Sequence, residues 1–297
     1  MDTPQPIGVI GLGELGSAIA SRLVAKGHRI RLYDLDGNRR RSFPVARLAS
    51  EIAPSLTDFG NDCEIIMAAL PDIAALRDAA YGDDDRPGFA HALRPGSVII
   101  HFGTGPYMEV LRLTGQLGHG GVGLIDALTC ANAHPSDGCP MEMLVGGFDD
   151  LVERARPALE ALGSFTRIGG TGSATGLAAL RGYVRAARLI ALSEAMLIGR
   201  HAGIDPGLLA RVFDGPIAAG PECRSLTGEA ATLLREHDLD TTSRHVADAV
   251  AFSERIGVSG ECVAFARDML ADALSGSVGT DESTLLKHFS ALAEAEI

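Results

Sequence analysis

The residues with the clearest chemical pattern are three closely spaced glycines near the start of the chain, Gly11, Gly13 and Gly16. They form a G-x-G-x-x-G motif directly after the apolar run Ile7–Ile10. In such a turn the first glycine bends the chain, the second lets a pyrophosphate approach the backbone, and the third lets a helix pack against a strand. The N–H groups at the start of that helix then face the phosphates. Because a strand precedes the motif and an amphipathic helix follows it, the pattern predicts a dinucleotide-binding turn.

The sequence also has a carboxylate at the position that binds the ribose in folds with such a turn. Asp34 follows the β-rich residues 29–33, at the position from which a carboxylate accepts hydrogen bonds from the adenosine ribose. A charge-assisted hydrogen bond of this kind is worth about 1.5–3 kcal/mol, and the same charge repels the 2′-phosphate of NADP. Arg39, Arg40 and Arg41 follow; they form either a solvated helix face or a pocket for that phosphate. We expect NAD to be preferred, with NADP as the alternative cofactor.

A second polar stretch, Asp126 to Gly147, starts on one strand candidate and ends on another, with a turn-rich loop between them. Cys130, Asn132 and His134 stand where this loop would face a pocket. No strong base or cation is adjacent to Cys130 in sequence, which favours a pocket-lining thiol over a reactive one. We expect a substrate-binding loop.

Alternating elements position these residues in the first half of the chain. Besides the strands before Gly11 and Asp34, strand candidates cover residues 64–70, 96–101, 123–127, 141–145 and 164–168. Helical segments lie between several of them, and this alternation predicts a mostly parallel sheet with crossover helices. We therefore expect an α/β fold with an N-terminal Rossmann domain over residues 1–170.

The second half, residues 171–297, reads as an all-α domain. Ser173–His201 is one long, mostly apolar stretch that ends before Gly203, typical of a helix buried on several sides, such as a domain spine or a dimer interface. Asp205 and Pro206 supply an N-cap and a proline at the first helical position. Thr280 and Asp281 indicate another helix start. We expect this domain to bind substrate and to dimerise.

The bulk composition excludes several functional classes. A net charge of −12 with a pI near 5.2 argues against nucleic acid or an anionic membrane as partners. Five cysteines without framework or metal-type spacing indicate reduced thiols in a cytoplasmic protein without a metal site. We see no signal peptide and no apolar run long enough to span a bilayer.

The motifs together resemble the β-hydroxyacid dehydrogenase family, which includes 3-hydroxyisobutyrate dehydrogenase, and its relatives the imine reductases. The resemblance covers nearly the whole chain and rests on the segments IGLGELGSAIASRLVAKGH, CEIIMAALPD, LRPGSVIIHFGTGP and SEAMLIGRHAGIDPGLLARVF. It implies a homodimer or homotetramer with the active site in an interdomain cleft. The cofactor-binding residues that the motifs and the resemblance imply are Gly11, Leu12, Gly13, Glu14, Leu15, Gly16, Asp34, Leu70, Pro71 and Thr104.

The loop departs from the family motif D-A-P-V-S-G-G at the positions that hold a substrate carboxylate. Four residues match the family: Asp126, Ala127, Gly146 and Gly147. Cys130 replaces the serine, and Ala131 and Asn132 replace the two glycines. A thiol is a weak donor, and a β-carbon restricts the approach of the backbone. We still expect a substrate-binding loop, and its changed residues leave open both a hydroxy acid and a different ligand.

The family's general acid/base, a lysine on the long helix, is also missing. Counted from Glu194 of the family's E-A pair, its position is Ala178, and the family asparagine one turn later is Gly182. A second register, set by Gly176, puts the catalytic position at Gly182. The remaining candidates for proton transfer are Arg181, Tyr183 and His134. Each also has a non-catalytic interpretation: Arg181 as a structural cation, Tyr183 as a core or interface residue, and His134 as an exposed loop residue.

Three functions follow from this pattern. The first is an oxidoreductase that moves a hydride between NAD(H) and a small hydroxy acid, alcohol or aldehyde. The second is an imine-reductase-like enzyme, because an iminium substrate already carries its charge and needs less help from a proton donor than a carbonyl does. The third is a dinucleotide-binding protein without hydride transfer, since the cofactor turn is intact while the catalytic position is alanine.

Overall fold

The computed structural model describes residues 5–43, 51–61, 63–83, 86–130, 140–213, 239–258, 260–275 and 288. Thr280 and Asp281, the predicted helix start, lie outside these ranges. The chain divides into two compact units, Met1–Leu177 and Ala178–Ile297. The division falls within the long helix α7, Ser173–His201.

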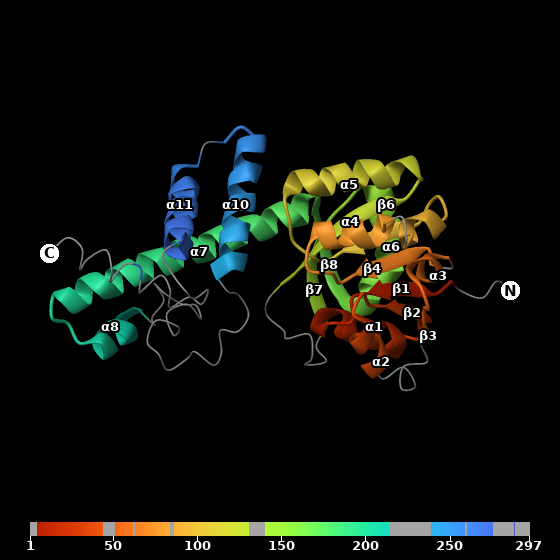
Figure 1. Ribbon diagram of the computed structural model, residues 1–297, viewed down its shortest axis with the longest axis horizontal. Helices are drawn as coiled ribbons and strands as arrows, with labels where there is room; N and C mark the ends of the chain where they lie inside the picture. The colour runs from red at the N-terminus through yellow and green to blue at the C-terminus, as the bar shows by residue number, and fades with distance from the viewer. Residues whose placement is uncertain are drawn as a thin grey trace. The chain divides into compact units, whose positions relative to one another are not determined.

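The first unit is built on an eight-stranded sheet in the order β3-β2-β1-β4-β5-β6-β7-β8 (Figure 1). The strands are β1 Ile7–Ile10, β2 Ile30–Tyr33, β3 Glu51–Ile52, β4 Ile65–Ala68, β5 Val98–His101, β6 Gly123–Thr129, β7 Met141–Gly146 and β8 Gly163–Gly169. All neighbours pair in parallel except β6 and β7, which pair antiparallel. The order reverses beside β1, because β2 and β4 flank it on opposite sides. This reversal is the switch point at which open α/β sheets bind their ligands.

Helices cover both faces of the sheet, as Figure 1 shows for α1 and α4. They are α1 Glu14–Ala25, α2 Gly37–Ser42, α3 Leu56–Gly60, α4 Ile73–Tyr81, the 3-10 helix η2 Phe89–Ala92, α5 Tyr107–His119 and α6 Asp149–Leu162. Alternate residues of β1 enter different cores: Val9 packs with α1 and α6, and Ile10 packs with α3, α4 and α5. A sheet buried on both faces requires the continuous apolar runs seen in its sequence.

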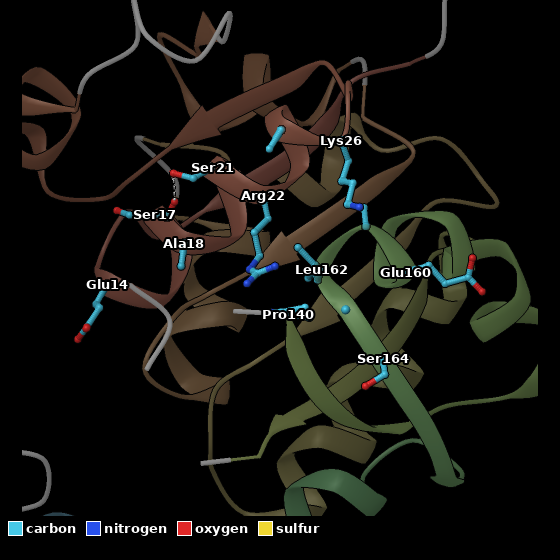
Figure 2. Close-up of a pocket in the computed structure, with 13 residues that line it drawn as sticks. Glu14, Ser17, Ala18, Ser21, Arg22, Lys26, Pro140, Glu160, Leu162 and Ser164 are labelled. Carbon is cyan, nitrogen blue, oxygen red and sulfur yellow. Dashed lines mark hydrogen bonds between the residues drawn. The ribbon is translucent and has the colours of Figure 1, made fainter. Parts of the chain in front are cut away.

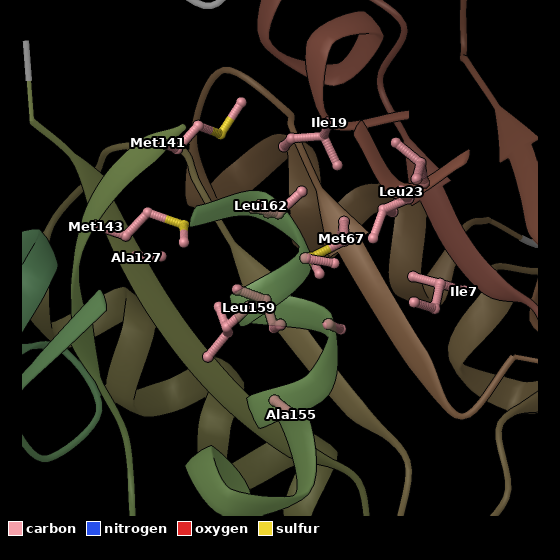
Figure 3. Packing of buried hydrophobic residues seen from close by; sticks show 14 of the residues in the cluster. Ile7, Ile19, Leu23, Met67, Ala127, Met141, Met143, Ala155, Leu159 and Leu162 are labelled. Atoms are coloured by element: carbon pink, nitrogen blue, oxygen red, sulfur yellow. The ribbon is translucent and has the colours of Figure 1, made fainter. Parts of the chain in front are cut away.

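The core between the sheet, α1 and α6 fixes the helix that starts at the glycine turn. Ile19 and Leu23 lie one turn apart on α1 and are fully buried. Figure 3 shows them converging with Leu159 of α6 on Met67 of β4. The four-residue spacing read from the sequence thus identifies the buried face of α1.

The second unit is helical in all of its described elements. After α7 come α8 Pro206–Phe213, α10 Leu239–Arg255 and α11 Glu261–Ser275. Leu189 of α7, Val246 of α10 and Leu270 of α11 belong to one buried cluster. The predicted α8 start is confirmed, because the Asp205 carboxylate accepts a hydrogen bond of 2.9 Å from the Leu208 N–H.

The predicted fold class, an N-terminal Rossmann domain followed by a helical region, is confirmed. β3 was not predicted from the sequence, because it has only two residues and no hydrophobic pattern of its own. Among the described residues, no helix is long and apolar enough to cross a membrane. Within the same residues, no three His, Cys, Asp or Glu side chains are grouped to hold a metal ion.

Candidate active site

The glycine turn after β1 leaves room for a ligand at one of its three glycines. Gly11 has a φ of +89°, and a Cβ there would lie 2.3 Å from the Ala69 carbonyl oxygen. A Cβ on Gly16 would lie 1.7 Å from the Gly11 carbonyl oxygen. At Gly13 the nearest atom to such a Cβ is an Arg39 nitrogen at 3.9 Å. The protein's own packing requires glycine at the first and third positions and leaves space beside the second, where a pyrophosphate would approach.

The start of α1 fits an anion. Gly13 is its N-cap residue, and no side chain caps the helix. The N-terminal N–H groups of a helix lack partners within the helix and carry a partial positive charge. Glu14 is exposed at the first helical position, and Leu15 packs partly against the core. These residues could therefore hold the pyrophosphate of a dinucleotide.

Asp34 is tied to the glycine turn by backbone hydrogen bonds. It is 4% exposed at the end of β2. Its Oδ2 accepts from the Leu12 N–H at 2.5 Å, and its Oδ1 accepts from the Asp36 N–H at 2.7 Å. Since a carboxylate oxygen has more than one acceptor position, Asp34 keeps capacity for a ribose hydroxyl. Its role as a ribose ligand stays a prediction.

The three arginines after Asp34 have different surroundings. Arg40 donates to the Asp34 carbonyl oxygen at 3.0 Å and stacks 4.7 Å from the centre of the Tyr33 ring. Arg41 donates to the Asn38 side chain. The Arg39 guanidinium lies 3.9 Å from Asp34 Oδ2 and next to Gly13. Of the three, Arg39 is therefore the one that lies beside the glycine turn, and its contact with a 2′-phosphate stays a prediction.

Two further loops carry predicted cofactor residues to the same edge of the sheet. Thr104 follows β5, and its N–H donates to the Pro71 carbonyl oxygen at 3.2 Å. Its own carbonyl oxygen accepts from the Ile73 N–H at 2.9 Å. Leu70, after β4, is buried. The structure thus brings Leu70, Pro71 and Thr104 together, and their contact with a cofactor stays a prediction.

The predicted substrate loop is described only at its two ends. Cys130 is partly exposed after β6, and its N–H donates to the Glu142 carbonyl oxygen at 2.8 Å. Ala131, Asn132 and His134 lie outside the described residues. The roles of all four in binding or catalysis stay predictions.

Asp126, at the start of that loop stretch, holds the beginning of α7. Its two carboxylate oxygens accept from the N–H groups of Gly172 and Thr175, both at 2.7 Å. Burial raises the pKa of this carboxyl group, and the hydrogen bonds from Thr175 and Gly172 oppose that shift. A Cβ on Gly146 would lie 2.5 Å from Asp126 Oδ1. The family glycine at this position therefore leaves space for the carboxylate.

Both positions considered for the missing lysine are buried and small. Ala178 is 7% exposed, and Gly182 is also buried on α7. Arg181 is exposed, whereas Tyr183 packs partly buried against the helical core. Tyr183 therefore has the surroundings of a core residue. Catalysis by Arg181 or Tyr183 stays a prediction.

A histidine on α10 lies against α7 at the second of these positions. A Cβ on Gly182 would lie 2.4 Å from the Cβ of His245 and 2.9 Å from its Nδ1. Asp248 follows three residues later, and burial raises the pKa of its carboxyl group to about 6, with the charge of Arg244 opposing the shift. His245 was not predicted from the sequence as a site residue, because no local spacing connects it to α7.

A second overlooked histidine ends β5. His101 is fully buried, and neither ring nitrogen has a hydrogen-bond partner in the described part of the chain. Burial lowers its pKa to about 4, and the Thr104 backbone and the charge of Asp72 offset this only in part. A Cβ on Gly103 would lie 2.5 Å from the ring. His101 is thus a neutral packing residue beneath the loop that carries Thr104.

The sheet order and the turn geometry define a dinucleotide-binding Rossmann protein. Residues 6–172 match the family described as the NAD binding domain of 6-phosphogluconate dehydrogenase. The chain belongs to the β-hydroxyacid dehydrogenase family of NAD(P)-dependent oxidoreductases, as its motifs predicted.

Relatives and solved structures agree with this assignment. A probable mitochondrial 3-hydroxyisobutyrate dehydrogenase of Dictyostelium discoideum is 23% identical over 79% of this chain and 77% of its own length. The 2-hydroxy-3-oxopropionate reductase of Escherichia coli is 25% identical over 72% of this chain and 71% of its own.

Among structures, the 3-hydroxyisobutyrate dehydrogenase of Mycobacterium tuberculosis with L-serine has a TM-score of 0.77 at 18% identity, covering 97% of this chain and 99% of that one. An imine reductase from Myxococcus stipitatus with NADP+ has a TM-score of 0.59 at 20% identity, covering 96% and 99%. At these identities the structures show a shared fold.

Proposed function

We propose that this protein transfers a hydride between NAD(H) and a small hydroxy acid, alcohol or aldehyde. The observation that carries the proposal is the open space beside Gly13, next to an uncapped helix N-terminus and the buried Asp34. When bound, the nicotinamide cofactor supplies or accepts the hydride. The start of α1 holds the pyrophosphate, and Asp34 accepts from the ribose and disfavours the 2′-phosphate.

The proton that accompanies the hydride needs a donor other than the family lysine. Arg181, Tyr183 and His134 remain candidates, and we add His245 because its side chain fills the space beside Gly182. An imidazole titrates near neutral pH and can both donate and accept a proton. We also assign substrate binding and association into a homodimer or homotetramer to the helical unit.

An imine substrate is the second candidate. The observation that favours it is that α7 has no titratable side chain at Ala178 or Gly182. A substrate that already carries a positive charge depends less on a donor there. A dinucleotide-binding role without turnover is the third candidate, supported by the same two positions.

Cofactor titration and a Gly13→Val variant test the proposal. Valine fits the backbone, because Gly13 has a φ of −67° and open space around its Cβ direction. We expect wild type to bind NADH about tenfold more tightly than NADPH, as measured by nicotinamide fluorescence. We expect Gly13→Val to keep the wild-type Tm and to lose NADH binding and turnover across a panel of hydroxy acids, aldehydes and imines.

Control variants make each outcome interpretable. Gly115→Ala is the matched glycine control, because a Cβ there meets nothing within 4 Å; it should bind NADH normally. Asp34→Asn should narrow the preference for NADH over NADPH. Tighter NADPH binding by wild type would contradict the preference for NAD. Binding of neither cofactor would contradict the proposed function, and binding without turnover would favour the third candidate.

A further inference from the structure

A large cavity lies along α1 and has no role in the proposed hydride transfer. Its volume is about 980 Å³. Arg22 and Lys26 line it from α1, and the end of α6, the start of β8 and Pro140 line the opposite side (Figure 2). Of the predicted cofactor residues, only Glu14 reaches its margin. The cavity is therefore a candidate for a second ligand.

The Arg22 guanidinium lacks a hydrogen-bond partner in the part of the chain that the structure describes. Its Nε and Nη2 are shielded from solvent and make no hydrogen bond within the described residues. Figure 2 shows the side chain extending from α1 toward Pro140 and Leu162. Burying part of a charged group without a hydrogen bond is unfavourable by several kcal/mol. The arrangement therefore indicates a missing anionic partner.

The neighbouring carboxylates do not fill that role. Glu160 is paired with Arg156, whose Nη1 lies 3.3 Å from Glu160 Oε1. In Figure 2 the carboxylates of Glu14 and Glu160 point away from Arg22. Among the described residues, no carboxylate forms an ion pair with Arg22 or Lys26. Arg22 and Lys26, one helical turn apart, thus line the cavity without a carboxylate partner from the described residues.

The end of α6 offers a competing explanation for the two cations. Cations are stabilised near a helix C-terminus, where the carbonyl groups carry partial negative charge. Neither shielded nitrogen of Arg22 donates to those carbonyl oxygens. Charge complementarity with α6 therefore leaves the hydrogen-bonding capacity of Arg22 unused.

We propose that this cavity binds a small organic molecule through an oxyanion group, a carboxylate or a phosphate. Because Nε and Nη2 of Arg22 are shielded from solvent, binding would require the side chain to turn its guanidinium toward two oxygens of the group. The Lys26 ammonium would add a second charge. The apolar surfaces of Ala18, which is partly exposed, and of Ala25 and Pro140, which are exposed, would contact the carbon body of the ligand. The site does not depend on which nicotinamide cofactor the protein uses.

Calorimetric titration of the full chain tests the site. Citrate and inorganic phosphate are the two probes, which separate a carboxylate from a phosphate preference, and sodium chloride at matched ionic strength is the baseline. We expect one probe to bind wild type above the baseline and Arg22→Met to weaken its Kd at least tenfold. Arg94→Met removes an exposed arginine elsewhere on the same unit and should leave the Kd within twofold.

Saturating NADH shows whether the probe binds in this cavity or at the glycine turn, because the glycine turn also suits oxyanions. The probe should still bind in its presence. Displacement by NADH, equal binding to wild type and Arg22→Met, or no binding above the chloride baseline would each overturn the proposal. If Arg22→Met does not fold, Lys26→Met, at an exposed position, takes its place with an expected loss of at least threefold, and unchanged binding would again overturn it.

Discussion

At the scale of single residues, a missing side chain on one helix coincides with a titratable side chain on another. α7 has glycine at position 182, and the Cβ, Cγ and Nδ1 of His245 occupy the space beside it. A side chain at position 182 could not coexist with this placement of His245, because even its Cβ would approach the histidine Cβ to 2.4 Å. The imidazole of His245 on α10 therefore occupies the space that a side chain at position 182 of α7 would take.

We expect His245→Gln to lower kcat for carbonyl reduction about 100-fold, the range that general acid catalysis contributes. The NADH Kd should stay unchanged, since the predicted cofactor residues all lie in the first unit. Wild-type kcat should fall as pH rises through the pKa of the donor, because the neutral imidazole no longer supplies the proton. Steady-state kinetics between pH 5.5 and 9 would measure this change in kcat.

His201→Gln is the matched control, because His201 is an exposed histidine near the end of α7; it should behave as wild type. Unchanged kcat and an unchanged pH profile in His245→Gln would exclude His245 as the donor. If His245→Gln lowers kcat strongly with aldehydes and only slightly with imines, this agrees with the lower need of iminium substrates for a proton donor.

At the scale of elements, the junction between β6 and α7 shows what the sequence could and could not predict. The strand and helix on either side of the glycine turn and the helix Ser173–His201 were predicted correctly, because each depends on residues close together in the sequence. The hydrogen bonds of Asp126 to Gly172 and Thr175 join residues 46 and 49 positions apart. The contact of His245 with Gly182 is equally non-local. Such pairings arise from packing, which leaves no periodic signal.

We expect Asp126→Ala to lower the free energy of unfolding by about 3 kcal/mol. Two buried N–H groups at the start of α7 would lose a charged acceptor, and each such loss costs about 1–3 kcal/mol. Urea denaturation measures the total. Amide hydrogen exchange should accelerate at Gly172 and Thr175, which locates the effect at this helix end.

Asp126→Asn is the conservative comparison, because its side-chain oxygen can still accept one of the two bonds; it should lose less stability. Wild-type stability and unchanged exchange in Asp126→Ala would show that these hydrogen bonds do not hold α7.

At the scale of the whole molecule, buried titratable groups connect stability to pH in opposite directions. His101 has a pKa of about 4 when folded and 6.5 when free, so the unfolded chain binds a proton that the native chain excludes. Its contribution is fully present above pH 6.5 and is lost as pH falls toward 4. The raised carboxyl pKa values of Asp126 and Asp248 act oppositely, because the native form holds its proton to higher pH.

We expect the free energy of unfolding of wild type to fall by about 2 kcal/mol more than that of His101→Leu between pH 7.5 and 5. Leucine keeps a buried side chain of similar size and removes the titration. Both proteins contain Asp126 and Asp248, so the carboxyl contributions cancel in the difference. Chemical denaturation at the two pH values measures it, and equal pH dependence in the two proteins would contradict the assignment to His101.

The close approach of His245 to Gly182 also restricts which amino-acid substitutions can be accepted at these two positions during evolution. A single mutation at position 182 to any larger residue collides with the histidine, and the nearest atom is its rigidly placed Cβ rather than a movable tip. Before a larger residue can be accepted at position 182, a smaller residue must replace His245 or α10 must move. The order of substitutions at these two positions is thereby constrained.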